Sequence, residues 1–329
     1  MWLWSDTKRF KLLAAGLLAL VGVQGNTLAA SATFSGYHWP QHRSGPYQAS
    51  LTNALWAKLL VPKRDLPSAS QSASGSTDVT VKESESWSPR LTMRTGGVKP
   101  GGLFVALSFA QAPLSVSLNA PKLGEDAGHR LVMPAFTVTG RLSSQGKWTL
   151  FRILTRPGAA LPPGVNVRVL LPMAAKPAQW LPPVPRAGWI SGQSFIHRIT
   201  VSPAQLLSVP ALGASDAVVT GGPWTIVAKV SPRLTTQGNW DVMSKVEPSA
   251  PLKASIRAKV GTDTVSTKVS LTLSGSNQVI LSPRGRLKHQ HAKETVAITQ
   301  TTNGAGPSSK SVLPLTEQLS ERLNWTLSP

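Results

Sequence analysis

Apolar and polar residues alternate along much of the second half of this chain, and this alternation constrains the fold more than any other feature. Segments 252–260 and 265–273 each place an apolar residue, or Thr267, at every second position, with Lys, Arg, Ser or Thr between. A period of two is that of a β-strand with one buried and one wetted face. The intervening Gly261-Thr262-Asp263 favours a tight hairpin. We therefore expect antiparallel strands that bury one face.

A short sequence that occurs twice adds a second constraint. Residues 141–148 read Arg-Leu-Ser-Ser-Gln-Gly-Lys-Trp, and residues 233–240 read Arg-Leu-Thr-Thr-Gln-Gly-Asn-Trp. In each copy a polar Gln-Gly turn precedes a strand that begins at Trp148 or Trp240. The two copies are separated by about the length of one β-sandwich domain. The repeat predicts equivalent hairpins in two related β-domains; the alternative is coincidence in a chain rich in Ser, Thr and Gly.

The first thirty residues have the features of a secretory signal. Lys8, Arg9 and Lys11 precede an apolar stretch at 12–23, and small residues follow at 29–32. The apolar stretch has the length of a signal-peptide core and is short for a bilayer span. We expect cleavage near residue 30 and export, the alternative being an uncleaved anchor. We expect no transmembrane span after it.

Composition supports an all-β protein with two domains. The chain has 329 residues, no Cys, 27 Pro and 11 Trp. We expect two immunoglobulin-like antiparallel β-sandwich domains after a cleaved signal peptide. The expected boundaries are 1–30 for the signal peptide, 31–205 for an N-terminal ligand-binding domain, 206–222 for a linker and 223–329 for the C-terminal domain.

Positive charge is the main functional signal in the sequence. The chain carries 34 Lys and Arg against 14 Asp and Glu, a formal net charge of +20. The densest basic stretch, 284–293, predicts attraction to anionic glycans, lipopolysaccharide or acidic lipids; the alternative is a solvated basic face. Two Trp in the Pro-rich segment 172–189 suggest a carbohydrate platform or, alternatively, anchors on a core. The candidate ligand-binding residues are Arg284, Arg286, Lys288, His289, Lys293, Trp180 and Trp189.

Catalytic and metal-binding patterns are scarce. His289 and His291 are the local metal candidates, but no third ligand is near in sequence. No Gly-x-Ser-x-Gly elbow, phosphate loop or dinucleotide fingerprint occurs. We therefore expect no enzymatic activity, no metal and no cofactor. Nucleic acid is not an expected partner, because no DNA-binding motif accompanies the charge.

An exported, Cys-free chain of two β-domains with a basic surface resembles a minor subunit or tip adhesin of chaperone–usher fimbriae. The resemblance rests on the signal peptide, the alternating strands of 224–329 and a final strand at 319–327 that ends near Pro329. It implies an incomplete sandwich whose groove is filled by a strand of a neighbouring subunit. Residues 31–48 lack the clean alternation of a donor strand, which departs from the shaft-subunit pattern and suits a tip subunit.

The resemblance implies a fimbrial tip adhesin or minor pilin, joined by donor-strand complementation and binding anionic glycans or glycolipids. Its implied partners are other fimbrial subunits, a periplasmic chaperone, an outer-membrane usher and a host glycan or glycolipid. The implied location is the periplasm in transit and then the fimbrium at the cell surface. Two alternatives stay open: a free-standing exported binding module for acidic polysaccharide or a lipid surface, and an uncharacterised hydrolase.

Overall fold

The computed structural model describes residues 33–63, 75–155, 181–203, 218–246, 251–260, 263–305 and 315–329, and β-strands dominate them. The elements in chain order are β1 (Thr33–Phe34), β2 (Ser44–Pro62), β3 (Ser76–Trp87), β4 (Arg90–Lys99), β5 (Gly102–Phe109), β6 (Ala112–Ala120), the 3-10 turn η3 (Pro121–Leu123), β7 (Glu125–Met133), β8 (Phe136–Leu142), β9 (Trp148–Thr155), β10 (Trp189–Ile190), β11 (Phe195–Val201), β12 (Val218–Thr220), β13 (Trp224–Leu234), β14 (Trp240–Val246), β15 (Leu252–Val260), β16 (Asp263–Leu281), β17 (Leu287–Ala305) and β18 (Leu315–Ser328). None of the helices found in these ranges is long and apolar enough to cross a membrane.

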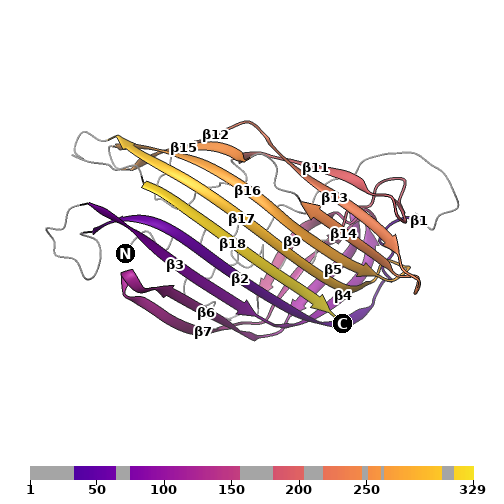
Figure 1. The fold of residues 1–329 in the computed structure, drawn as a ribbon. Coiled ribbons are helices and arrows are strands. Elements are labelled where there is room, and N and C mark those ends of the chain that lie inside the picture. Colours follow the sequence, from indigo (N-terminus) through magenta and orange to yellow (C-terminus); the bar gives the residue numbers. More distant parts are fainter. Residues whose placement is uncertain are drawn as a thin grey trace.

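A single antiparallel sheet holds sixteen of these strands. Its main path runs β11-β13-β14-β16-β17-β18-β2-β4-β5-β8-β9. The sheet forks at β2, because β4 pairs with residues 44–48 and β3 pairs with residues 51–62 of the same long strand. From β3 one branch continues through β6 to β7. The long strands lie side by side and are steeply inclined in Figure 1.

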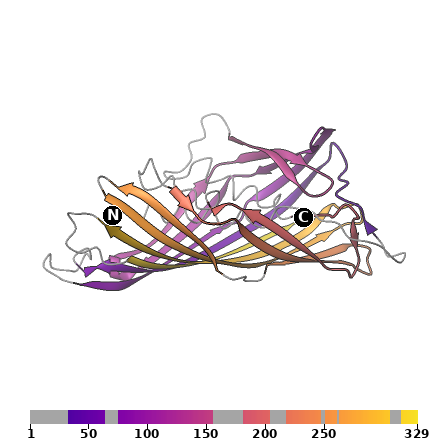
Figure 2. The ribbon, with the colours of Figure 1, turned by 90° about the horizontal axis from the view of Figure 1, so that it is seen from above.

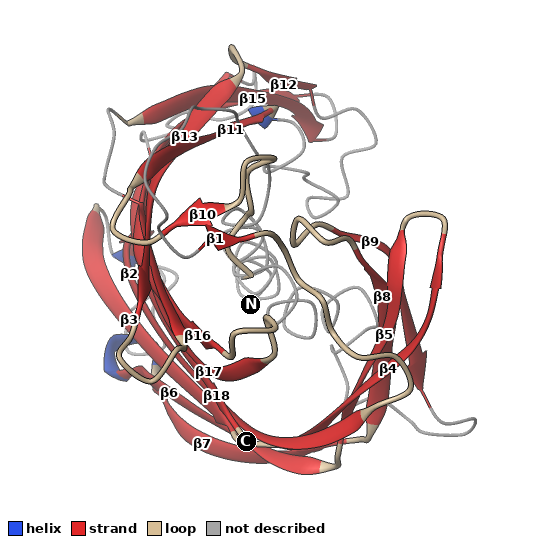
Figure 3. Ribbon diagram, turned by 90° about the vertical axis from the view of Figure 1, so that its right-hand side faces the viewer, coloured by secondary structure: helices blue, strands red, loops and turns tan. Residues whose placement is uncertain are grey.

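The sheet curves strongly, so that it has an inner and an outer face. Viewed along its length it wraps around an interior that contains the two-stranded pair β1–β10 (Figure 3). Viewed from above, the branch with β4, β5 and β8 rises away from the wall made of β16 to β18 (Figure 2). Inward residues of β4 and β5, and those in the first part of β14 and of β17, belong to one buried cluster with Phe34 and Trp189. The buried phase of each strand is therefore the phase that faces the interior.

The all-β class is confirmed. The structure does not show two immunoglobulin-like sandwiches, because one sheet holds strands from both expected domains. Strand β18, expected to end a separate C-terminal domain, pairs with β17 on one edge and with β2 on the other. Strand β11 likewise pairs with β13 across the expected linker 206–222. Alternation fixes which face of a strand is buried, but it does not fix which strand lies beside it. The expected domain boundaries stay a prediction, because strand pairing does not show which parts of the chain are stable on their own.

The repeated sequence forms equivalent hairpins, as expected. In the first copy the Gly146 N–H bonds to the Ser143 carbonyl and the Lys147 N–H to the Ser143 Oγ. In the second copy Thr235, Gly238 and Asn239 make the same bonds. The strands then resume with the pairs Leu142–Trp148 and Leu234–Trp240.

A third copy of this turn was not evident from sequence. It joins β16 to β17, where Ser282 accepts from the N–H groups of Gly285 and Arg286. Pro283 and Arg284 replace the Thr-Gln or Ser-Gln of the other copies, and no Trp follows. Gly146, Gly238 and Gly285 have φ of 84°, 75° and 76°, a conformation that glycine adopts without steric cost. The retained pattern is thus Ser or Thr, two residues, then Gly.

Candidate functional site

One half of the interior is filled by the chain itself. We call residues 33–39 and 181–190 the inner plug. Phe34 stacks on Trp189 with ring centroids 4.5 Å apart and meets Trp240 of the wall edge-on at 5.8 Å. Trp189 is 1% exposed, and its indole N–H bonds to the Pro183 carbonyl. Aromatic side chains buried in this way contribute strongly to stability.

Two of the equivalent turns hold the inner plug in place. The Tyr37 N–H bonds to the Ser144 carbonyl at 2.8 Å, and the Val184 N–H bonds to the Gln145 carbonyl at 3.1 Å. The indole N–H of Trp39 bonds to the Gly285 carbonyl of the third turn. Burial raises the pKa of the Tyr37 phenol well above its ordinary value, while its hydroxyl bonds to the Pro182 carbonyl at 2.8 Å. The repeated turns are therefore docking points for the inner plug as well as strand connections.

The other half of the inner face is also apolar. We call it the far half; it lies at the left of Figure 1, where β15 and the start of β3 are found. A second buried cluster, separate from the first, is built there by β13, β15, β16 and β17, with Val269, Leu271 and Val296 among its members. Buried Leu55 and Val81 extend the apolar lining onto β2 and β3. Within the described ranges, no segment comparable to the inner plug crosses the far half.

A row of polar side chains separates the two apolar regions. We call it the polar belt, and its members come from five strands. On β2, Asn53 lies between Leu51 of the first cluster and Leu55 of the far half. The belt consists of Ser244, Asn277, Gln290, Glu294, Asn53, Glu83 and Glu85.

Several belt residues are deeply buried and linked by hydrogen bonds. The Asn53 amide donates to the Glu85 carboxylate at 3.2 Å, and the Gln290 amide donates to the Asn277 carbonyl oxygen at 3.4 Å. Gln290 is fully buried and Asn53 is 6% exposed. Their side-chain carbonyl oxygens have no hydrogen-bond partner in the described part of the chain. Buried acceptors of this kind favour a donor placed against them.

The belt is not arranged as a metal site. Among the described residues, no three His, Cys, Asp or Glu side chains come close enough together to hold a metal ion. The carboxylates are instead spread along the row: Glu294 is on β17, and Glu85 is on β3, three strands away on the other side of β18 and β2. The arrangement supplies a line of hydrogen-bond acceptors across an apolar surface.

The outer face of the sheet has the opposite character. Outward positions of β16 carry Ser266, Lys268, Ser270, Thr272 and Ser274, and the other long strands show the same preference. Among the described residues, the exposed large apolar side chains come from eight different strands. They are Trp56, Val98, Phe104, Val132, Leu154, Ile196, Val218 and Met243.

The residues expected to bind ligand are not brought together at one site. Trp189 lies in the core of the inner plug, as the alternative of an anchor on a core predicts, and it is not part of a surface platform. Trp180 lies outside the described residues. Arg284 and Arg286 belong to the β16–β17 turn, and the Arg286 side chain hydrogen-bonds the Tyr47 phenol. That bond and the Arg286 charge partly offset the rise that burial gives the Tyr47 pKa.

The remaining basic candidates lie along β17. Lys288 and Lys293 are exposed and His289 is half-buried. Burial lowers the pKa of the neighbouring His291, and the charges of Lys293 and His289 lower it further. Anion binding by Arg284, Arg286, Lys288, His289 or Lys293 stays a prediction.

Sequence reasoning missed the polar belt, although a signal was present. Glu83 and Glu85 stand in phase with Val79, Val81 and Trp87, so they occupy positions of the buried face. A carboxylate in the apolar phase of a strand is costly unless it has partners, and it marks a place where the interior differs from a plain core.

Comparison with known proteins gives no family for this chain. No family model and no curated protein matches it. Among solved structures, an outer membrane channel from Pseudomonas putida F1 aligns over 92% of this chain and 100% of its own, with 7% identity and a TM-score of 0.24. OccK7 (OpdD) from Pseudomonas aeruginosa aligns over 87% and 100%, with 8% identity and a TM-score of 0.23. Similarity at this level carries no argument about activity.

The resemblance to fimbrial subunits was wrong. The similar structures are not fimbrial subunits, and a donor-strand groove requires an incomplete sandwich, whereas β18 is paired along both edges. The expected roles as tip adhesin or minor pilin fall with it, as do the partners: fimbrial subunits, chaperone, usher and host glycan. The fimbrial location falls as well, and export of the protein stays a prediction.

Proposed function

We propose that the protein is a water-exposed transport component of the cell envelope that shields the apolar part of an amphipathic molecule in the far half of its inner face. One observation carries the proposal: the sheet is apolar on its inner face and polar on its outer face. Burial of apolar area is favourable by about 25 cal/mol per Å². A curved sheet with this polarity is suited to enclosing an apolar chain while its outside stays in water.

The outer face supports a position in water. A strand wall in contact with lipid carries an outward apolar band, and charged residues placed there are destabilising. Here Lys268 stands between Ser266 and Ser270 on the outward side of β16. Lys229 on β13 and Arg322 on β18 are likewise exposed.

The polar belt supports an amphipathic occupant with one polar group. The far half would hold an acyl or similar chain, and the belt would receive a head group that donates hydrogen bonds. Asn53 and Gln290 supply buried acceptor oxygens at that boundary. We propose that an occupant enters between the two ends of the main strand path, β9 and β11, which are not paired with each other in the described residues. The proposal involves no catalysis.

Equilibrium binding of a fluorescent long-chain fatty amine and of its fatty-acid counterpart, measured without detergent, tests this function. We expect saturable binding with emission typical of an apolar site. Val296→Asp and Leu271→Asp place a charge in the far half and should weaken binding by tenfold or more. Met243→Asp, on the exposed side of β14, is the matched control and should leave binding within twofold of the unchanged protein.

The variants also separate the chain site from the head-group site. Gln290→Leu keeps the side chain near its present size but removes the acceptor. It should therefore weaken binding of the amine head group and leave the binding free energy of the apolar chain unchanged. Absence of saturable binding to the unchanged protein, or equal binding by the Val296→Asp and Met243→Asp proteins at comparable folded content, would contradict the proposal.

A further inference from the structure

The outer face carries a hollow that the proposed transport role does not use. Two adjoining cavities of about 530 and 500 Å³ lie over β18, β2, β3, β6 and β7, and they share Ala54, Ser84 and Ser117. We call them together the outer hollow. Most of its lining residues come from the outward phase of their strands, so it lies on the opposite side of the sheet from the polar belt.

The floor of the outer hollow is a row of small side chains in register. Ala54 on β2 pairs with Ser84 on β3, Ser84 with Ser117 on β6, and Ser117 with Gly128 on β7. Arg322 on β18 begins the row beside Ala54. Five neighbouring strands span about 19 Å at their usual spacing. An extended peptide of about six residues has the same length.

Cations surround this floor. Lys82 and Arg322 line the first cavity and Arg130 lines the second, all three exposed. Within the described residues, none of them has a carboxylate at ion-pairing distance. Glu83 and Glu85 also contribute to the lining, but they belong to the inward phase of β3. Asp126, opposite Asn119 on β7, is an outward carboxylate at the rim.

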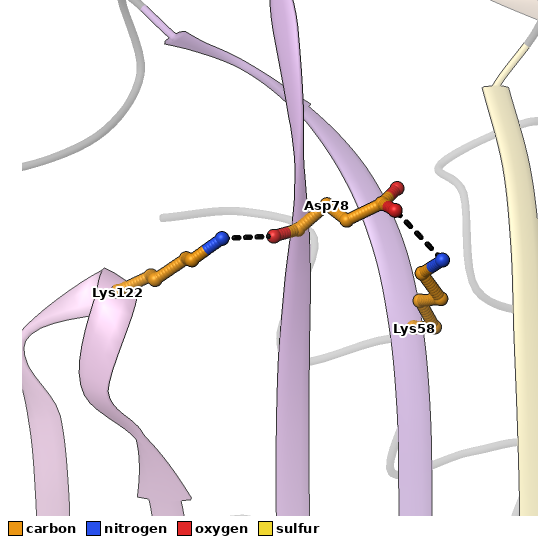
Figure 4. Close-up of polar contacts among 3 residues, drawn as sticks. All are labelled: Lys58, Asp78 and Lys122. Atoms are coloured by element: carbon orange, nitrogen blue, oxygen red, sulfur yellow. Dashed lines mark hydrogen bonds and ion pairs between the residues drawn. The ribbon is translucent and has the colours of Figure 1, made fainter.

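A neighbouring lysine shows the contrast. The Lys58 ammonium lies 2.7 Å from the Asp78 carboxylate, and the Lys122 ammonium donates to the Asp78 main-chain carbonyl at 2.8 Å (Figure 4). Lys58, the next outward residue after Trp56 on β2, is thus paired with a carboxylate of the chain. The cations of the outer hollow instead face solvent. Charge complementarity therefore points to an acidic occupant from outside the chain.

We propose that the outer hollow binds an extended acidic segment of a partner protein. Carboxylates of the segment would meet Lys82, Arg322 and Arg130, and the small floor lets its main chain approach the sheet closely. Asn119 and the Ser side chains supply donors and acceptors for peptide groups. Trp56, 36% exposed at one side, offers a surface for an apolar residue of the segment. The proposal is independent of what the inner face holds.

Fluorescence anisotropy with a labelled eight-residue peptide of Glu and Leu tests this site on the full chain. We expect saturable binding that weakens as salt rises. The Lys82→Ser, Arg322→Ser double variant should bind at least tenfold more weakly. The control is the Lys229→Ser, Lys268→Ser double variant, which removes the same charge from exposed positions of β13 and β16 and should stay within twofold.

Two further binding measurements identify the kind of molecule that occupies the outer hollow. A peptide with Lys in place of Glu should not bind, and Trp56→Ala should weaken the Glu-Leu peptide without changing the salt dependence. Equal loss in both double variants would overturn the site, since it would reduce binding to overall charge. Tighter, Lys82- and Arg322-dependent binding of dextran sulfate or inorganic phosphate would overturn the peptide as the occupant.

Discussion

At the scale of single residues, the turns that hold the inner plug depend on glycine. Gly146 has φ of +84°, and a Cβ there would lie 2.8 Å from a ring carbon of Tyr37; Gly192 has φ of +82° with nothing within 4 Å. Alanine at either position costs about 1 kcal/mol for the left-handed conformation. Gly146→Ala should lose more, because Tyr37 must also move. Denaturant unfolding of the two variants measures the difference; equal losses would mean that the plug is not packed as described.

The two tyrosines of the chain predict how stability depends on high pH. Burial raises the pKa of both Tyr37 and Tyr47 in the folded protein, and more strongly for Tyr37. Below pH 10 each phenol is neutral in folded and unfolded chains, so this contribution is fully present. Above pH 10 the unfolded chain loses protons first, and the free energy of unfolding should fall.

Tyr37→Phe isolates the larger share of this effect. The variant loses the hydrogen bond to Pro182, about 1 kcal/mol at neutral pH, but its stability should fall less steeply above pH 10. Unfolding free energies at several pH values, together with phenolate absorbance, provide the measurement. A variant whose alkaline decline matches that of the unchanged protein would show that Tyr37 is not buried.

At the scale of elements, β18 is an interior strand, and β7 is an edge strand within the part of the chain that the structure describes. Over residues 318–327 β18 is paired with β17 on one side and β2 on the other, so N–H groups on both sides have partners, whereas alternate N–H groups of β7 face away from β6. Asn324→Pro should therefore be strongly destabilising, because proline removes a ladder hydrogen bond in the middle of the sheet. Of Gly128→Pro and His129→Pro, one should be tolerated. Thermal unfolding checks this order; tolerance of Asn324→Pro would place β18 at an edge.

Local elements could be predicted well from the sequence, and their partners could not. The 252–260 and 265–273 alternation and the turns before Trp148 and Trp240 form as predicted, because period and turn chemistry act within a few residues. The pairing of β18 with β2 joins residues near opposite ends of the sequence, and nothing in the sequence of either strand identifies the other as its partner. The sandwich prediction failed there.

At the scale of the whole molecule, the register and curvature of the sheet determine where the polar residues of the buried phase lie. Glu294 and Asn53 are far apart in sequence and on strands separated by β18, and the register of these strands places them in one row, because Glu294 and Asn53 both lie opposite Leu323. The curvature of the sheet then turns this row toward the interior. The sequence shows that each stands in a buried phase, but it contains no measure of how the sheet bends. Trp189 is a similar case, because its ring contacts come from Phe34 of β1 and Trp240 of β14, which are distant in the sequence.

Site-specific photocrosslinking in intact cells tests the central claim most directly. A photoreactive residue is placed either at Val296, which faces the far half, or at its neighbour Thr295, which faces outward, and the captured adducts are identified by mass spectrometry. The account predicts an amphipathic adduct at position 296 and none at position 295. Adducts of bulk lipid at 295, or none at 296, would contradict a water-exposed sheet that carries its ligand on the inner face.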